Sequence, residues 1–497
     1  MTLGKLVLFV ALAAAVLTAV IRWQKKSDSL WLSFLQNFAG VLFIFSGWVK
    51  AIDPLGTAYK MEQYFAEFQA TFAETWLSFI APLFPALASL SAGFSVFMII
   101  LEIVLGLMLI TGTKPKLSAW LFFLIVLFFT FLTGFTFLTG YVADGVNFFS
   151  FSDWGEYDAN NMKVTDCGCF GDFLKLEPRI SFYKDLVLLV PALLFLFFSR
   201  TMHQLWTPPI RLSLVGIATV GLLIYCLSNY VWDLPHTDFR PFREGTDIAA
   251  QKEAEMEASA NAPVSYELVN KSSNERVVLT MEQFMSEFKN FPKEEWEYNQ
   301  KKGEPAIPTT KISEFDVEDE EGYPVTDEIL NRQGYHLMLI SDKLYAKGTR
   351  EKTIVMYDST FAYDTFTTEV TMDTQVVRRL ENVVENSYTT EVPDWDPDFI
   401  SRYTNIVAPF ADAAREAGVA VYAITKGMTP EARADFAAAA RADFPLYQAD
   451  DILLKTIIRS NPGFVLWKDG TILKKWHYKQ LPPFEEVQRM YLSDDGN

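Results

Sequence analysis

Cysteine, histidine and runs of basic residues are scarce in this chain of 497 residues. It has three cysteines, too few for a disulfide-rich secreted scaffold. None of its four histidines lies near the two clustered cysteines, so no metal site is expected, because zinc takes four nitrogen, sulfur or oxygen ligands. The formal net charge of -18 and the lack of polybasic runs argue against nucleic acid as a partner, since nucleic-acid binding needs a basic surface.

Apolar residues make up half of the sequence, and most of them lie before Trp232. About 20 helical residues cross the hydrocarbon of a bilayer. Six runs have this length, and we predict spans at Leu3–Ile21, Leu30–Val49, Gly93–Ile110, Leu117–Tyr141, Phe182–Phe198 and Leu212–Val231. We interpret the first as an uncleaved span, with a signal peptide as the alternative, because no small-residue cleavage site follows it. Trp76–Leu90 is apolar but short and contains two prolines, which predicts that it lies at the interface or packs over the bundle.

The loops between the predicted spans alternate in charge. Basic residues gather in the loops after the first, third and fifth spans, and the other loops are longer and acid-rich. The positive-inside rule makes the basic loops cytoplasmic. The loop Val142–Ser181 and everything after Trp232 are then extracytoplasmic. This predicts a multi-pass protein of a bacterial inner membrane with a periplasmic C-terminal domain.

The chain after Trp232 reads as an acidic soluble protein. From Tyr335 a strand, a helix and a second strand are followed by a hairpin and a last helix, which is an α/β pattern. The predicted organisation is an N-terminal transmembrane helix at 1–29, a membrane domain at 30–233, a linker and small strand-rich region at 234–334, and an α/β domain at 335–497. An insertion is expected near 346–394, with a charged helix around "DTQVVRRLENVVENS".

Two cysteines, Cys167 and Cys169, stand one glycine apart in "TDCGCFGDF". Two adjacent thiols seldom stay reduced in an oxidising compartment. A disulfide across one residue is strained, and strained disulfides exchange more readily. Catalytic redox activity at these cysteines is weighed against a passive disulfide staple and a pair of unreacted structural thiols. The third cysteine, Cys226, lies within a predicted span and is expected to be an inert apolar residue.

Charged residues in or beside the predicted spans form a candidate intramembrane polar site. A carboxylate inside a span, such as Glu102, is costly and by default suggests function. The alternative is a structural polar contact to Lys50 or to a backbone group. Lys50 and Asp53 at a helix end are also typical of interface anchors or caps. Lys184 and Asp185 are expected to be solvated or to contact headgroups.

The membrane half resembles the DoxX/DoxD group of membrane proteins over roughly Leu30–Ser199. The similar stretches are "FIFSGWVKAIDPLGTAYKMEQYF" and "LEIVLGLMLITG", the second with Glu102 and Gly106 in matching places. "CGCFGD" is similar to the loop of the MauE-like branch, which is associated with maturation of a disulfide-rich partner enzyme. The resemblance implies a four-helix core within the bundle and a role for Cys167 and Cys169 in that maturation.

The C-terminal part resembles thioredoxin-like domains in "IIRSNPGFVLWKDGTILKKW", where Pro462 matches the structural cis-proline that precedes a strand. The whole layout is similar to DoxX-type proteins of Bacteroidota that carry such a tail. A working thioredoxin has Cys-x-x-Cys at the start of its first helix. This chain has no cysteine after Cys226, so the resemblance implies a tail that binds a partner without thiol exchange.

The predicted protein is therefore a membrane bundle of about six helices with a C-terminal thioredoxin-like α/β domain that lacks Cys-x-x-Cys. The leading hypothesis is thiol–disulfide chemistry at Cys167 and Cys169 on an extracytoplasmic partner protein. The electron carrier is unknown, with a quinone as one candidate. One alternative is a non-enzymatic envelope assembly or scaffold protein. A further alternative is a quinone-linked oxidoreductase subunit that oxidises small sulfur compounds.

Overall fold

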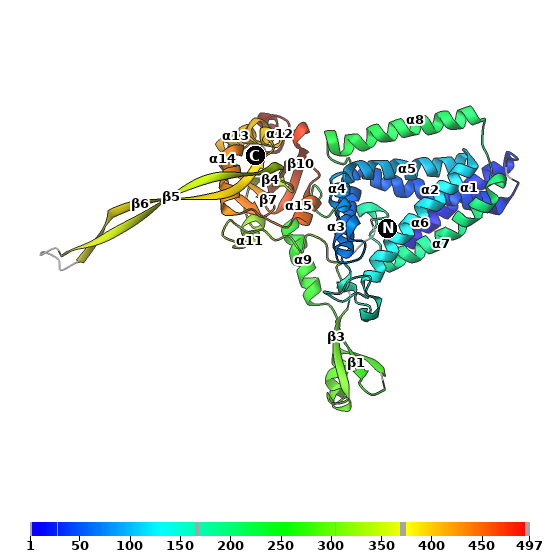
Figure 1. Cartoon of the computed structure of the whole chain (residues 1–497), viewed down its shortest axis with the longest axis horizontal. Helices are drawn as coiled ribbons and strands as arrows, with labels where there is room; N and C mark the ends of the chain where they lie inside the picture. Colours follow the sequence, from blue (N-terminus) through cyan, green and yellow to red (C-terminus); the bar gives the residue numbers. More distant parts are fainter. Residues whose placement is uncertain are drawn as a thin grey trace, which may run out of the picture. The chain divides into compact units, whose positions relative to one another are not determined.

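The structure is a computed structural model that describes residues 2–26, 28–164, 168–273, 275–303, 305–367 and 374–492. The chain divides into two compact units, and the boundary between them in the sequence falls between Arg240 and Pro241. The first unit is helical, and the second contains all of the β-sheets (Figure 1).

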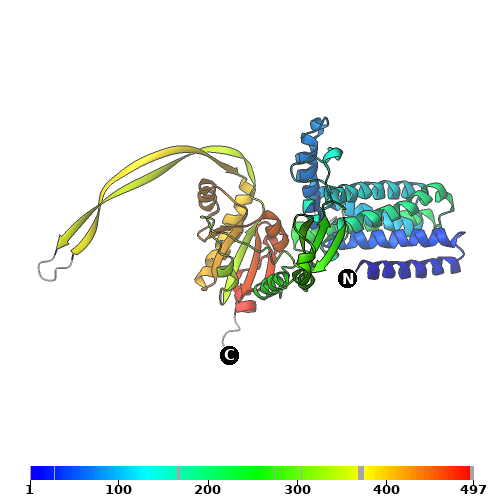
Figure 2. The ribbon, with the colours of Figure 1, turned by 90° about the horizontal axis from the view of Figure 1, so that it is seen from below.

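Among the described residues, six helices of the first unit are long and apolar enough to cross a membrane, which agrees with the predicted multi-pass membrane protein. Figure 2 shows several of them running side by side as a bundle. Three of them begin with proline in the first turn, at Pro115, Pro178 and Pro208. Another begins after Ser29, whose side chain accepts a hydrogen bond from the Leu32 amide, and another ends at Gly112 in the left-handed conformation. The six are α1 (Leu3–Trp23), α2 (Leu30–Ile52), α5 (Ser91–Thr111), α6 (Pro115–Thr139), α7 (Pro178–Phe198) and α8 (Pro208–Leu227).

Helices α2 and α5 touch through their backbones at two glycines. A Cβ atom added at Gly40 would lie 2.8 Å from the carbonyl oxygen of Gly106, and one added at Gly106 would lie 2.6 Å from that of Gly40. Small residues allow this approach, which is a common way for membrane helices to pack when lipid offers no hydrophobic driving force. Any side chain at either position would force the two helices apart.

Short elements connect the spans at the end of the bundle where α2 ends and α5 begins. These are α3 (Pro54–Ala73), η1 (Ser78–Ile80) and α4 (Leu83–Ser89), and then, between α6 and α7, the single turns η2 (Phe151–Asp153), η3 (Ala159–Asn161) and η4 (Gly171–Phe173). The apolar segment of η1 and α4 is too short to span a bilayer. Its Trp76 and Phe79 side chains are 84% and 72% exposed.

The second unit is built on a five-stranded sheet with the order β10-β9-β4-β7-β8. Strands β4, β7 and β8 are parallel to one another, β9 is antiparallel to β4, and β10 is antiparallel to β9. The α/β prediction is thereby confirmed. The strands are β4 (Tyr335–Ser341), β7 (Ala420–Thr425), β8 (Leu446–Gln448), β9 (Gly463–Lys468) and β10 (Thr471–His477). The helices around them are α12 (Pro397–Arg402), α13 (Ala408–Glu416), α14 (Pro430–Ala440), α15 (Asp451–Ile457) and α16 (Phe484–Val487).

Both faces of this sheet are buried, so its strands are apolar at successive positions. One face packs Leu337 and Leu339 into a core with the helices α12 to α14. On the other face Trp467 lies 6.2 Å from Phe315 between ring centroids. The segment from Pro241, with α9 (Ile248–Ala260) and α11 (Thr326–Leu330), therefore belongs to the same compact unit as the sheet.

Two small sheets complete the second unit. The first contains β1 (Val264–Asn270), β2 (Arg276–Thr280) and β3 (Trp296–Lys302), with α10 (Met281–Glu287) beside it. The other is the long hairpin of β5 (Ala346–Thr367) and β6 (Thr374–Trp395), which Figures 1 and 2 show leaving the domain as a ribbon.

The hairpin corrects one prediction. The stretch expected to form a charged helix is strand β6, paired antiparallel with β5 from Ala346↔Trp395 to Thr367↔Thr374. Its valines and threonines have a high strand propensity, and the partner strand satisfies the backbone groups that a helix would have satisfied locally. The base of the hairpin is held by Asp435 of α14, which accepts hydrogen bonds from Arg350 (2.9 Å) and from the indole of Trp395 (3.0 Å).

Candidate functional site

The described end of the cysteine loop packs against the membrane helices of the first unit. Thr165, Asp166 and Cys167 lie outside the described residues. Gly168 has φ +61°, and a Cβ atom there would lie 3.2 Å from Cγ of Lys60 on α3, so glycine suits both the backbone and the space. Phe170, one residue past Cys169, is fully buried in the bundle.

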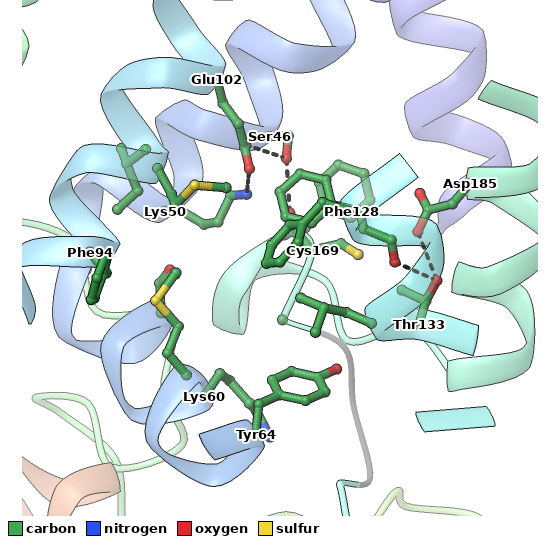
Figure 3. A pocket seen from close by; sticks show the side chains of 18 of the residues that line it. Ser46, Lys50, Lys60, Tyr64, Phe94, Glu102, Phe128, Thr133, Cys169 and Asp185 are labelled. Atoms are coloured by element: carbon green, nitrogen blue, oxygen red, sulfur yellow. Dashed lines mark hydrogen bonds and ion pairs between the residues drawn. The ribbon is translucent and has the colours of Figure 1, made fainter. Parts of the chain in front are cut away.

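A cavity of about 420 Å³ lies behind this loop (Figure 3). Side chains of α2, α3, α5, α6 and α7 line it together with the loop, and most of them are apolar. Phenylalanines recur around the wall, among them Phe94 and Phe97 of α5 and Phe128 of α6. Cys169 is part of the same wall. The volume is in the range of small-molecule binding sites.

One polar group in the cavity wall is the ion pair between Lys50 of α2 and Glu102 of α5. The two residues are 5% and 2% exposed. Ser46 Oγ lies 3.1 Å from Glu102 Oε2 and 2.9 Å from the carbonyl oxygen of Cys169, and its single hydrogen serves one acceptor at a time. Lys50 and Glu102, two of the three predicted polar residues, therefore meet. Asp53 instead caps α3 by accepting a hydrogen bond from the Gly56 amide at 3.1 Å, and it does not line the cavity.

A second ion pair joins the neighbouring residues Lys184 and Asp185 at the start of α7, with 2.5 Å between Lys184 Nζ and Asp185 Oδ1. Thr133 of α6 donates a hydrogen bond to Asp185 Oδ2 at 3.0 Å. Asp185 is 2% exposed. The expectation that these two residues are solvated or contact headgroups was wrong for Asp185, because the packing of α7 against α6 encloses it. The threonines of α6 recur every three residues, at Thr130, Thr133 and Thr136, and this polar stripe is the signal that could have located the pair.

The thiol of Cys169 is free in the structure. Burial raises its pKa above the ordinary value; the positive charge of Lys184 opposes that rise, and the negative charge of Asp185 adds to it. The thiol is therefore protonated at neutral pH, and its reaction as a thiolate needs a base or a change of surroundings. Cys226 does not line this cavity and is fully buried on α8 in an apolar cluster that includes Ile99.

The predicted structural proline lies in the second unit. The Asn461–Pro462 peptide bond is cis and stands directly before β9. Asn461 donates a hydrogen bond to the carbonyl oxygen of Lys343 at 2.6 Å, and its own carbonyl accepts one from Arg402 at 2.7 Å. The first bond joins the segment after β4 to the loop before β9, and the second joins α12 to the same loop. The sequence after β4 contains no cysteine.

No group of three or more histidine, cysteine or acidic side chains with metal-binding geometry occurs among the described residues. In comparisons with known proteins, no family model, no curated protein and no solved structure matches the chain. The cavity and its polar residues therefore carry the functional argument.

Proposed function

We propose that this protein carries out thiol–disulfide exchange at the membrane surface, with Cys167 and Cys169 as its redox pair. One observation carries the proposal: the free thiol of Cys169 lines a cavity among the predicted spans whose wall also contains two ion pairs with buried carboxylates. Buried charges in a membrane segment are costly, which is why they usually mark a functional site. A passive staple would need neither the cavity nor the charges.

The exchange balances in two steps. In the first, the Cys167–Cys169 disulfide accepts two electrons from a partner protein, whose two thiols become a disulfide while the pair becomes a dithiol. In the second, the dithiol is reoxidised and gives two electrons and two protons to a lipid-soluble acceptor. Asp185 is the proposed acceptor of the Cys169 proton, because the two residues line the same cavity. Lys184 would then stabilise the thiolate that remains.

The proposal also assigns each of the two units to a fold, on the basis of the family resemblances in its sequence. We assign the membrane unit to a DoxX/MauE-like bundle with a four-helix core. The second unit, with strand order β10-β9-β4-β7-β8 and Pro462 before β9, supports a thioredoxin-like domain. Without cysteines this domain acts as a binding module for the partner. The location proposed for it is the periplasmic side of a bacterial inner membrane.

Burial of Cys169 favours a second candidate function. A thiol whose pKa is raised by an apolar environment is typical of an inert structural cysteine. The protein would then be an assembly factor of the envelope, with the long β5–β6 hairpin and the C-terminal unit as its binding surfaces. The third candidate, a quinone-linked oxidase of small sulfur compounds, would use the same cavity without a protein partner.

Trapping of free thiols in cells, followed by mass spectrometry, separates these functions. The redox function predicts a mixed population of oxidised and reduced Cys167–Cys169, and mixed disulfides with another protein when one cysteine of the pair is changed to serine. Cys226→Ser is the matched control and should alter neither result, because that cysteine does not line the cavity. The redox function would be refuted if Cys167 and Cys169 stay wholly in one oxidation state and the double Cys→Ser variant behaves like wild type.

A further inference from the structure

The ribbon of β5 and β6 projects from the second unit as a two-stranded sheet (Figure 2). Each strand has 22 residues, which gives a length of about 70 Å at the usual rise of about 3.3 Å per residue. Among the described residues, neither strand pairs with a third one. A two-stranded hairpin by itself is marginally stable at best in water, whereas further strands or a packed face stabilise it. The ribbon therefore gains from contacts beyond those between its own strands.

The second unit provides such contacts at the base of the ribbon. Arg350 of β5 and Trp395 of β6 donate hydrogen bonds to Asp435 of α14. Tyr388 of β6 donates one to Glu431 of the same helix at 3.2 Å. These contacts belong to the half of the ribbon that is nearest to the domain. In the outer half the side chains at positions 378–380 are exposed. The domain therefore stabilises the base of the ribbon and leaves this outer part accessible.

One face of the ribbon carries an apolar stripe, which is formed by Val355 and Phe361 of β5 and Leu380 and Val383 of β6. Three of these side chains are exposed, Val355 to 42%, Leu380 to 53% and Val383 to 44%. Val355 and Phe361 are an even number of positions apart, so they share a face of their strand. Leu380 pairs with Phe361, and Val383 pairs with Ser359 on the same face, because a bulge between the two pairs shifts the alternation by one residue. An accessible apolar stripe on a projecting ribbon is typical of an interaction surface.

Opposite charges flank this stripe on β6. Arg378 lies two positions before Leu380, and Glu385 lies two positions after Val383, so both share the face of the stripe. Both charged side chains are exposed. Along this face β6 therefore presents a basic, an apolar, a second apolar and an acidic side chain in turn. The guanidinium carbon of Arg378 lies 3.5 Å from the ring centroid of Phe361, and a guanidinium stacked in this way can still donate to a carboxylate in its own plane.

A second copy of the ribbon complements this order of side chains. Two copies that pack face to face about a two-fold axis across the strands place β6 of one copy antiparallel to β6 of the other. With the axis between Leu380 and Val383, Leu380 of each copy meets Val383 of the other. Arg378 of each copy then meets Glu385 of the other, so each contact forms twice. Such self-complementarity is what a two-fold interface requires.

The overlap about this axis is large enough for a specific interface. It extends from Thr374 to Thr389 on β6, which is about 50 Å, and a ribbon of two strands is about 10 Å wide. Each copy therefore contributes about 500 Å², and the total of about 1,000 Å² is close to the lower limit for specific interfaces. We infer that the β5–β6 ribbon binds the ribbon of a second copy of this chain, face to face and antiparallel, in a weak dimer. The contact involves neither the cavity nor its thiols, so it is independent of the proposed function.

Charge reversal on the full chain in detergent micelles tests this inference, with the association state measured by sedimentation velocity. Wild type should form a dimer whose fraction rises with concentration. Arg378→Glu brings two acidic side chains into each contact, and Glu385→Arg brings two basic ones. Each change should weaken the dimer at least tenfold, because like charges meet across the interface. Arg379→Glu is the matched control, since that neighbouring arginine lies on the opposite face of the strand and its change should leave the dimer intact.

An equimolar mixture of the two single variants identifies a second copy as the occupant. In a mixed dimer the introduced glutamate faces the introduced arginine, and the native Arg378 of one chain faces the native Glu385 of the other. The mixture should therefore regain the dimer that neither variant forms alone. The double variant Arg378→Glu, Glu385→Arg should dimerise as well as wild type. Such recovery also shows that the single variants are folded.

Three results would overturn the inference. The first is a wild-type chain that stays monomeric at every concentration reached. The second is a dimer that both charge reversals leave unchanged, because such a dimer forms through another surface. The third is a pair of weakened single variants whose mixture stays monomeric. In that case the two charges act within one chain or on a different protein.

Discussion

Removal of Lys50 alone tests the energetic role of the cavity's ion pair most directly. The Lys50 and Glu102 side chains are 6% and 3% exposed. In Lys50→Met the methylene stem is largely kept, but the Glu102 carboxylate remains buried with Ser46 left as its hydrogen-bond donor among the described residues. Breaking a buried pair in this way costs roughly 3–5 kcal/mol, because an uncompensated charge stays in the interior.

The double variant Lys50→Met, Glu102→Gln removes both charges and nearly conserves the volume. It should recover most of the lost stability, since replacing a whole buried pair with uncharged groups is often close to neutral. Lys163→Met is the matched control. Its pair with Asp144 is exposed, with side chains 51% and 86% accessible, and such a pair contributes about 0–1 kcal/mol.

Thermal unfolding of the full chain in nanodiscs measures the difference. For a unit of this size 1 kcal/mol shifts the melting temperature by roughly 2–4 °C, so Lys50→Met should melt about 6–20 °C lower than wild type. Lys163→Met should stay within about 4 °C of wild type. The reasoning is refuted if the two single variants melt alike, or if the double variant is as unstable as Lys50→Met.

Acid should destabilise the second unit, because burial lowers the pKa of both His336 and His477 to about 4 in the folded protein, against about 6.5 for an exposed histidine. The folded state then binds fewer protons than the unfolded state between these values. The full contribution of these histidines to the free energy of unfolding is present above about pH 6.5, and roughly 3 kcal/mol per histidine is lost as the pH falls towards 4. Denaturant unfolding across that pH range measures this loss. A free energy of unfolding that does not change with pH would contradict the prediction. Asp435→Asn should weaken the bonds of α14 to Arg350 and Lys352 by roughly 1.5–3 kcal/mol and speed proteolysis at the base of the hairpin. Unchanged cleavage would show that other contacts hold the hairpin.

Local patterns in the sequence were enough to predict the apolar helices and the α/β character of the second unit. A span is recognisable from its own residues, because a bilayer demands about 20 apolar residues whatever the neighbours are. Strand β4 is likewise a continuous apolar run, as expected for a strand buried on both faces. The segment of strand β6 was not predictable in this way, since its charged residues suit a helix and its partner residues on β5 lie from 7 (Thr367↔Thr374) to 49 (Ala346↔Trp395) positions earlier.

The candidate site shows the same division. The sequence alone predicted that the cysteines lie beside a membrane helix and that a carboxylate at Glu102 is energetically costly inside a span. Composition and position in the chain carry that information. Only the tertiary structure decided that Glu102 meets Lys50, that Asp185 is enclosed against α6, and that both pairs share one cavity with Cys169. These relations depend on side chains brought together from helices tens of residues apart. The periodicity of a single helix cannot encode which neighbour its polar face will meet.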